Sequence, residues 1–102
     1  MIIIVDIDKT LCIESPTTEA GPDYSKAQPI PVNIAKVNRA YDTGHTIILW
    51  TGRGGTTGID WGEITEKQLR SWGVKYHELK FKKIYYDLWI DDKALTIEDW
   101  EI

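Results

Sequence analysis

Two pairs of carboxylates, each placed directly after an apolar run, are the residues of this chain best suited to chemistry. Asp6 and Asp8 follow the aliphatic run 2–5, and Asp91 and Asp92 follow the run 87–90. Carboxylates gathered at one site repel one another, and a bound divalent cation is the usual remedy. Oxygen donors with few sulfur or imidazole ligands select a hard ion, so the pattern predicts Mg²⁺.

A hard cation among carboxylates points to phosphate chemistry. A carboxylate can attack phosphorus and form an aspartyl-phosphate, while a second carboxylate protonates the leaving oxygen and then activates water. Thr51, Gly52 and Arg53 follow another apolar run and could hold phosphate oxygens. Arg53 could instead pair with Asp60 or Glu63. A lysine close to the carboxylates could neutralise both the nucleophile and the charge that develops in the transition state.

Four predicted strands must position these groups. The aliphatic, β-branched run 2–5 is typical of a strand buried on both faces of a parallel sheet, and 45–51 is a second strand of this kind. The segment 74–79 is a weaker strand, and 87–90 is a fourth. In such sheets ligands bind outside the carboxyl ends of the strands, so the acids and Thr51 should meet at one edge.

Two helices are predicted between the first three strands. One begins near Pro31 and ends in a left-handed cap at Gly44. The other follows Asp60 and Glu63, which have capping-box spacing, and ends at Gly73. Strands that alternate with helices indicate an α/β layer fold with a mainly parallel sheet.

Two polar, glycine- and proline-containing stretches are predicted loops. The stretch 12–29 shows no helical period and is expected to form a long loop, with room for a small hairpin. A loop of this length in a compact domain is usually functional or disordered. The stretch 52–58 is glycine-rich and follows a buried strand, which favours contact with substrate.

Composition limits the classes of protein that this chain can belong to. The 102 residues predict one domain over 1–102, and the net charge of −4 argues against nucleic acid or an anionic membrane as a partner. A single cysteine excludes an internal disulfide, so a soluble, cytoplasmic protein is expected. Of the five tryptophans, Trp61, Trp72 and Trp100 either fill the core or build the interface of a homo-oligomer, and the sequence leaves both open.

Four motifs, in order, resemble those of the haloacid dehalogenase (HAD) superfamily. "DIDKT" fits its first motif, Asp-x-Asp-x-Thr/Val, and "ILWTGR" resembles the second, a hydrophobic strand that ends in Ser or Thr. "WIDDKA" resembles the fourth motif. The stretch "YHELKFKKIYYDLWIDDKA" is similar, without a gap, to the pattern YDELxFGKPxxDxxIDDKA of small HAD phosphatases. On that register Lys83 takes the position of the third-motif lysine, with Lys80 and Lys82 as the alternatives.

The resemblance implies a role for each of these residues. Asp6 would be the nucleophile and a metal ligand, and Asp8 the general acid and base, with its backbone carbonyl also reaching the metal. Thr51 would bind the transferred phosphoryl group, and Lys83 would steady that group and Asp6. The remaining Mg²⁺ ligands would be Asp91 and Asp92, of which Asp92 is favoured as the direct one.

The resemblance also implies a three-layer Rossmann-like sandwich with strand order 4-1-2-3. The segments between the motifs are too short for a cap domain, so a capless phosphatase is expected, with residues 12–28 or a neighbouring subunit as the lid. Its substrate would be a small phosphorylated metabolite, first of all a sugar phosphate. A polynucleotide 3′-phosphatase and a non-catalytic phosphate- or metal-binding module are the alternatives.

The chain departs from the family pattern at three positions. Many relatives have glycine at the position of Lys9. Lys82 and Ile84 replace the glycine and the proline of "GKP". Lys9 either attracts the anionic substrate or points to solvent, and the second interpretation is the stronger one.

Overall fold

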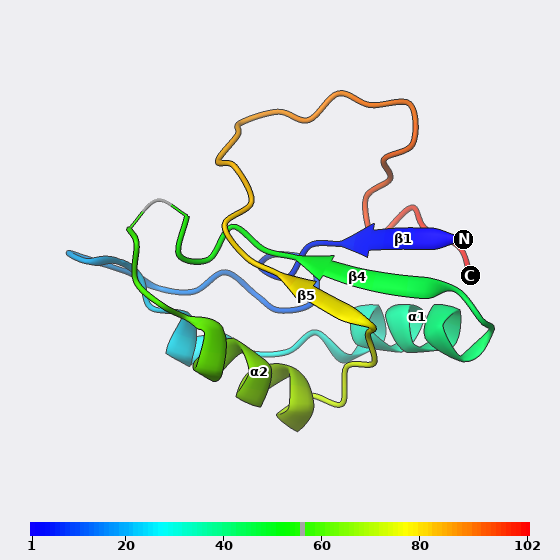
Figure 1. Ribbon diagram of the computed structural model, residues 1–102, viewed down its shortest axis with the longest axis horizontal. Coiled ribbons are helices and arrows are strands. Elements are labelled where there is room, and N and C mark those ends of the chain that lie inside the picture. The colour runs from blue at the N-terminus through cyan, green and yellow to red at the C-terminus, as the bar shows by residue number, and fades with distance from the viewer. Residues whose placement is uncertain (56) are drawn as a thin grey trace.

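A three-stranded parallel sheet forms the centre of the computed structural model, which describes residues 1–55 and 57–102. Its strands lie in the order β1 (Ile2–Val5), β4 (Thr46–Trp50) and β5 (Glu78–Lys80). The register pairs β1 with β4 from their first residues, so both strands end at the same edge (Figure 1). The prediction of a mainly parallel α/β fold is confirmed.

Two helices connect the strands, as predicted. Helix α1 (Pro31–Asp42) has proline at its first position. Proline is tolerated there because an N–H at this position would have no acceptor within the helix. Gly44 follows with a φ of 101°, in the left-handed region that glycine enters without strain. Gly73 ends α2 (Gly62–Ser71) in the same way, with a φ of 72°.

The start of α2 differs from the predicted capping box. Its N-cap is Trp61, which makes no side-chain capping hydrogen bond. Asp60 lies one residue earlier, where its Oδ1 accepts a hydrogen bond from the Gly62 N–H at 2.9 Å. The acidic spacing therefore marked the helix start correctly but was wrong about the residue that caps it.

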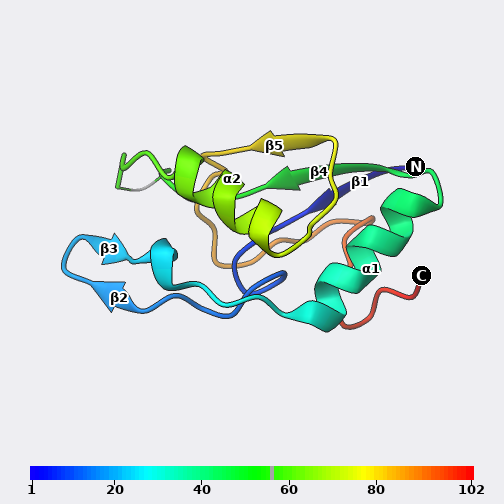
Figure 2. The ribbon, with the colours of Figure 1, turned by 90° about the horizontal axis from the view of Figure 1, so that it is seen from below.

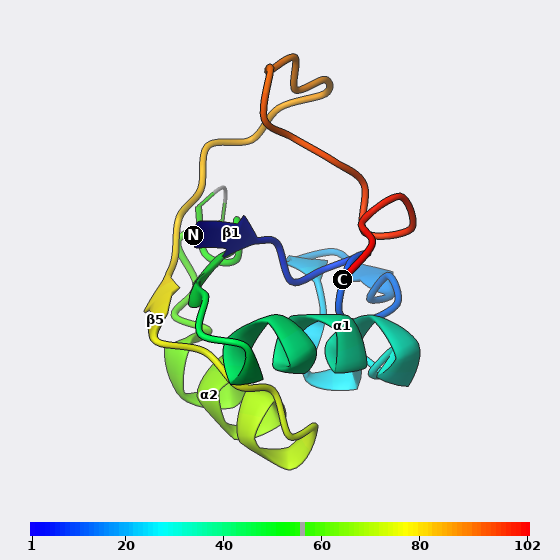
Figure 3. The ribbon, with the colours of Figure 1, turned by 90° about the vertical axis from the view of Figure 1, so that its right-hand side faces the viewer.

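Both helices cover the same face of the sheet, as Figure 3 shows. Side chains of β1 that point to this face are covered, and Val5 is buried. On the opposite face Ile2 is 71% exposed and Ile4 is 59% exposed. The prediction that β1 is buried on both faces is therefore wrong, and the described residues form two layers where three were expected, because none of their helices covers the second face.

The predicted fourth strand is not formed either. Residues 87–90 carry no strand pairing, and the segment 84–96 loops away from the sheet on the side of β1 (Figure 1). Leu88 is 74% exposed and Ile90 is 88% exposed. The backbone N–H and C=O groups of a strand must pair with a neighbouring strand. The apolar composition of 87–90 does not show whether such a neighbour is present. The first three predicted strands, which are β1, β4 and β5, lie in the expected order 1-2-3. The fourth predicted strand does not join them, so the order 4-1-2-3 is not observed.

The predicted long loop contains a short hairpin. Strands β2 (Thr17–Thr18) and β3 (Gly21–Pro22) are followed by the 3₁₀ turn η1 (Tyr24–Lys26). Figure 2 shows this hairpin projecting beyond the carboxyl ends of the sheet strands, beside the start of α2. The turn that follows β1 is held against α1, because the Asn33 side-chain amide donates to the Thr10 carbonyl at 2.8 Å. No helix in the described ranges is long and apolar enough to cross a membrane.

Candidate active site

Asp6 lies at the end of β1 with a lysine beside it. The Lys83 ammonium is 3.3 Å from Asp6 Oδ1, and the Ile7 N–H donates to the same oxygen at 2.8 Å. Burial raises the pKa of Asp6, and the charge of Lys83 acts against that shift. The result is a partly buried carboxylate that keeps a cation next to it, which suits a nucleophile.

The backbone explains why Lys83 reaches Asp6. Its N–H donates to the Thr51 carbonyl at 3.0 Å, which fixes this stretch against the end of β4. Lys80 lies on the surface, with its ammonium 3.8 Å from Glu78. The structure thus brings Lys83, of the alternatives considered, to the carboxylates.

Asp8 is held by an arginine from the loop after β4. Arg53 Nε donates to Asp8 Oδ2 at 3.0 Å, and Nη2 donates to Oδ1 at 2.9 Å. This two-point contact fixes the orientation of the carboxylate, because the planar guanidinium matches both oxygens at once. The Arg53 side chain is fully buried, whereas that of Asp8 is 23% exposed.

The remaining N–H groups of Arg53 also have partners within the protein. Nη1 donates to Thr65 Oγ1 at 2.9 Å and to Gln68 Oε1 at 2.7 Å. The guanidinium lies 4.6 Å from the centre of the Tyr24 ring, a cation–π contact. Arg53 was predicted to contact substrate, but in this arrangement it holds Asp8.

The partners of Arg53 were missed by sequence reasoning. Thr65 and Gln68 lie three residues apart on α2, between Trp61 and Trp72, on the stripe that faces the protein. Two polar residues on an otherwise apolar stripe are the signal that could have found them, since a buried polar group requires a partner. Tyr24 carries no comparable signal.

Thr51 and Gly52 follow β4 and lie against the backbone of Lys83. Thr51 is fully buried, and its Oγ1 accepts a hydrogen bond from the Arg53 backbone N–H at 3.2 Å. Gly52 is exposed, and a Cβ added to it would lie 3.4 Å from the Lys83 carbonyl. The strand ends therefore bring Asp6, Asp8, Thr51, Arg53 and Lys83 together.

Asp91 and Asp92 do not join this group. Both are exposed, and hydrogen bonds with neighbouring Asp92 and Trp89 lower the pKa of Asp91. Within the residues that the structure describes, no three His, Cys, Asp or Glu side chains are placed to hold a metal ion. In this arrangement, therefore, the residues present do not make a complete Mg²⁺ site.

Cys12 lies beside the acid but is not suited to nucleophilic chemistry. Its Sγ is 3.4 Å from Asp8 Oδ1 and the residue is fully buried. Burial, helped by the Asp8 charge, raises the pKa of the thiol to about 12. Since the thiolate is the reactive form, Cys12 serves as core packing, which agrees with its apolar neighbours.

Comparison with known proteins gives the fold of this chain and no family. No family model and no curated protein matches it. A crystal structure from Vibrio cholerae aligns with a TM-score of 0.78 and 26% identity, over 95% of this chain and 84% of that one. The structure of the Pnkp1/Rnl/Hen1 complex aligns with a TM-score of 0.61 and 20% identity, over 95% of this chain and 32% of that one. The α/β arrangement is thus shared with solved proteins.

Proposed function

We propose that this chain is a phosphomonoester hydrolase that works through an aspartyl-phosphate on Asp6. The observation that carries the proposal is the pairing of the two strand-end carboxylates with separate cations. Asp6 contacts Lys83 at 3.3 Å, and Asp8 forms an ion pair with Arg53 at 2.9 Å. A structural strand end has no need for two oriented acids, whereas phosphoryl transfer needs both a nucleophile and an acid.

The reaction divides into two steps. In the first, an Asp6 oxygen forms a bond to phosphorus while the bond from phosphorus to the leaving oxygen breaks, and Asp8, protonated at an oxygen that Arg53 has released, gives this proton to the leaving oxygen. In the second, Asp8 takes a proton from water, whose oxygen attacks phosphorus and releases Asp6 and phosphate. Lys83 neutralises negative charge on Asp6 and on the phosphoryl oxygens, and the amide of the exposed Gly52 donates to those oxygens.

Membership in the HAD superfamily is part of this proposal, and the backbone supports it. Among the described residues, Lys9 and Lys82 are the non-glycine residues with positive φ, at 64° and 58°. These are the two positions at which the resemblance places glycine. The chain thus has the glycine-type conformation at both positions although it has lysine there.

Mg²⁺ is proposed as the cofactor, with Asp6, Asp8, Asp91 and Asp92 as ligands. It would neutralise the carboxylates and polarise the phosphoryl group. The segment 87–90 must then pair with the free edge of β1, which gives the order 4-1-2-3 and brings the second acid pair to the site.

The chain is long enough for this pairing. The seven steps from Lys80 to Asp87 reach ~23–25 Å when extended. Three strand spacings, from β5 to the far side of β1, amount to about 14 Å, and a parallel strand that ends at this edge must begin about 13 Å back along the sheet, a direct distance of about 19 Å. Exposed Ile4 and Ile90 supply apolar surface that such pairing would cover.

The proposed substrate is a small phosphorylated metabolite, with a sugar phosphate first. The test is phosphate release from sugar phosphates, nucleotides, a 3′-phosphorylated oligonucleotide and p-nitrophenyl phosphate, with Mg²⁺ and with a chelator. We expect Mg²⁺-dependent release that Asp6→Asn abolishes and that the exposed control Asp42→Asn retains. If folded wild-type protein releases no phosphate from any of them, the proposal is wrong and a binding module remains.

A further inference from the structure

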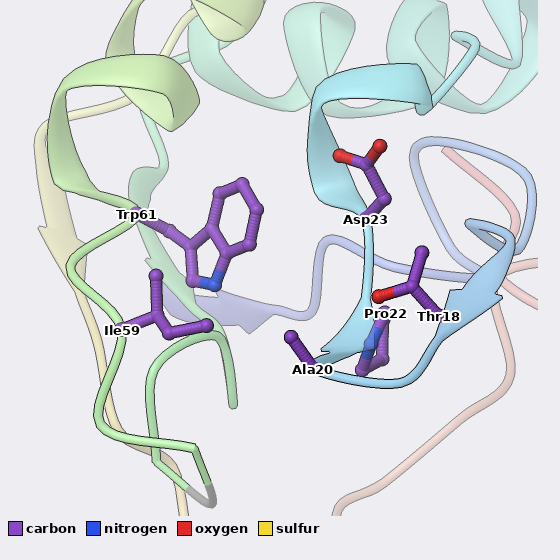
Figure 4. Close-up of a pocket in the computed structure, with 6 residues that line it drawn as sticks. All are labelled: Thr18, Ala20, Pro22, Asp23, Ile59 and Trp61. Carbon is purple, nitrogen blue, oxygen red and sulfur yellow. The ribbon is translucent and has the colours of Figure 1, made fainter.

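A small hollow lies between the β2–β3 hairpin and the residues that precede α2 (Figure 4). Its volume is about 180 Å³. Drug-sized ligands occupy pockets of roughly 300–1,000 Å³, so this hollow has room for a single ring or a group of similar size. The hairpin contributes one wall and the loop after β4 contributes the other; the lining residues are Thr18, Ala20, Pro22, Asp23, Ile59 and Trp61.

Trp61, which lines the hollow, is linked to the candidate acid Asp8 through Tyr24 and Arg53. Trp61 packs edge-on against Tyr24, with ring centroids 5.1 Å apart. The other neighbour of Tyr24 is Arg53, whose guanidinium lies 4.6 Å from the ring centre and grips Asp8. The negative charges of Asp8 and Asp6 also contribute to the raised pKa of Tyr24, after its burial, so both carboxylates lie within electrostatic reach of this ring. The hollow is therefore connected to Asp8 by successive contacts through Trp61, Tyr24 and Arg53.

The two walls are held close to each other. A Cβ added to Gly21, in the hairpin, would lie 2.9 Å from Thr57 Cγ2 in the opposite loop. Gly21 has a φ of 104°, a conformation that other residues rarely adopt. The hairpin thus approaches the loop as closely as a glycine allows, and the hollow is a built feature of the two segments.

The side chains that face the hollow are mainly apolar. In Figure 4 the indole of Trp61 and the side chain of Ile59 lie opposite Ala20 and Pro22. Asp23 lies on the hairpin side and adds a carboxylate, whose Oδ1 accepts a hydrogen bond from the Ser25 N–H at 3.1 Å. Such a lining suits a ring with an apolar face and a polar edge, which describes both a sugar and an aryl group.

We propose that this hollow binds the leaving group of the phosphomonoester and selects substrates in which that group is a single ring. The inference rests on the proposed phosphatase activity and adds to it the residues that choose the substrate. An acyclic leaving group has no ring to pack against the indole of Trp61, so it would gain no affinity from the hollow.

The test fills the hollow without disturbing the core. Ala20 is exposed, so Ala20→Leu adds volume to the hollow with little effect on folding, and Thr17→Leu places the same side chain on the hairpin outside the lining. Ile59→Ala removes part of the opposite wall. Phosphate release is measured for a hexose phosphate, phenyl phosphate and glycerol phosphate, and each variant is compared with wild type on the same substrate.

We expect Ala20→Leu and Ile59→Ala to raise KM for the two ring substrates tenfold or more and to leave KM for glycerol phosphate unchanged. Thr17→Leu should leave KM unchanged for all three substrates. A larger effect on the hexose phosphate assigns the hollow to sugars, and a larger effect on phenyl phosphate assigns it to aryl groups. Equal effects on all three substrates, or none, overturn the inference and leave the phosphatase proposal standing. Wild-type protein that turns over none of them overturns both.

Discussion

At the residue scale, Arg53 connects the chemistry of the site to the stability of the fold. Its guanidinium is buried and joins Asp8 to α2 through Thr65 and Gln68. A buried charge that loses its partner is costly, whereas an exposed pair contributes little. The residue that orients the proposed acid is therefore also a residue that the fold requires.

The first prediction concerns this arginine. Arg53→Gln should lower the free energy of unfolding by about 3 kcal/mol, because Asp8 is then left without its cation in a partly buried site. Arg70→Gln, on the exposed face of α2, should change it by less than about 0.5 kcal/mol. Urea unfolding followed by circular dichroism measures both. Equal, small losses would mean that the Arg53 network does not exist in solution.

A second prediction uses the left-handed conformation of Lys82. A non-glycine residue in this region costs of order 1–3 kcal/mol, which exceeds the roughly 0.4–1 kcal/mol lost when glycine makes the unfolded chain more flexible. Lys82→Gly should therefore raise the free energy of unfolding by about 1 kcal/mol.

Lys80→Gly is the matched control for that variant. It removes the same charge but lies in β5, where glycine should cost about 0.5–1 kcal/mol. Opposite signs for the two variants in urea unfolding support the positive φ at Lys82. A loss of stability in both would contradict it.

At the element scale, patterns that depend on local residues were predictable, and contacts between distant segments were not. The start of α1 at Pro31 and the caps at Gly44 and Gly73 follow from backbone preferences that each residue carries itself. Burial of 87–90 depends on a partner strand, and the composition "DLWI" cannot report whether that partner is present. The same limit applies to the candidate site, where Asp6, Asp8 and Thr51 were placed by strand ends but the partners of Arg53 were not.

A third prediction concerns the segment 87–90. If it pairs with the free edge of β1, its backbone amides should be protected from hydrogen exchange when Mg²⁺ is bound and exchange freely without metal. Asp92→Asn should not show this protection, while the amides of β4 stay protected throughout. Hydrogen exchange followed by mass spectrometry measures this. Protection that requires high protein concentration and accompanies dimers in size-exclusion chromatography would assign the edge to a second copy.

At the scale of the whole molecule, helices cover one face of the sheet and leave the other face exposed. The helices, the hairpin and the site loops lie with the core, whereas exposed Ile2, Ile4 and Leu88 gather on β1 and the segment 84–96. Apolar residues concentrated in this way usually mark a surface that pairs with something. We propose that the segment 87–90 pairs with the free edge of β1, beside this surface, which would also bring the distant acid pair to the site.

The proposed mechanism requires Asp6 as the nucleophile, and labelling of the protein by the transferred phosphoryl group tests this requirement. The protein is mixed with a phosphomonoester that carries a radiolabelled phosphoryl group, with Mg²⁺, and is quenched in acid during turnover. We predict acid-stable label on the peptide that contains Asp6 in wild-type protein and none in Asp6→Asn. Turnover without any label on the protein, or label that persists in Asp6→Asn, would contradict the account.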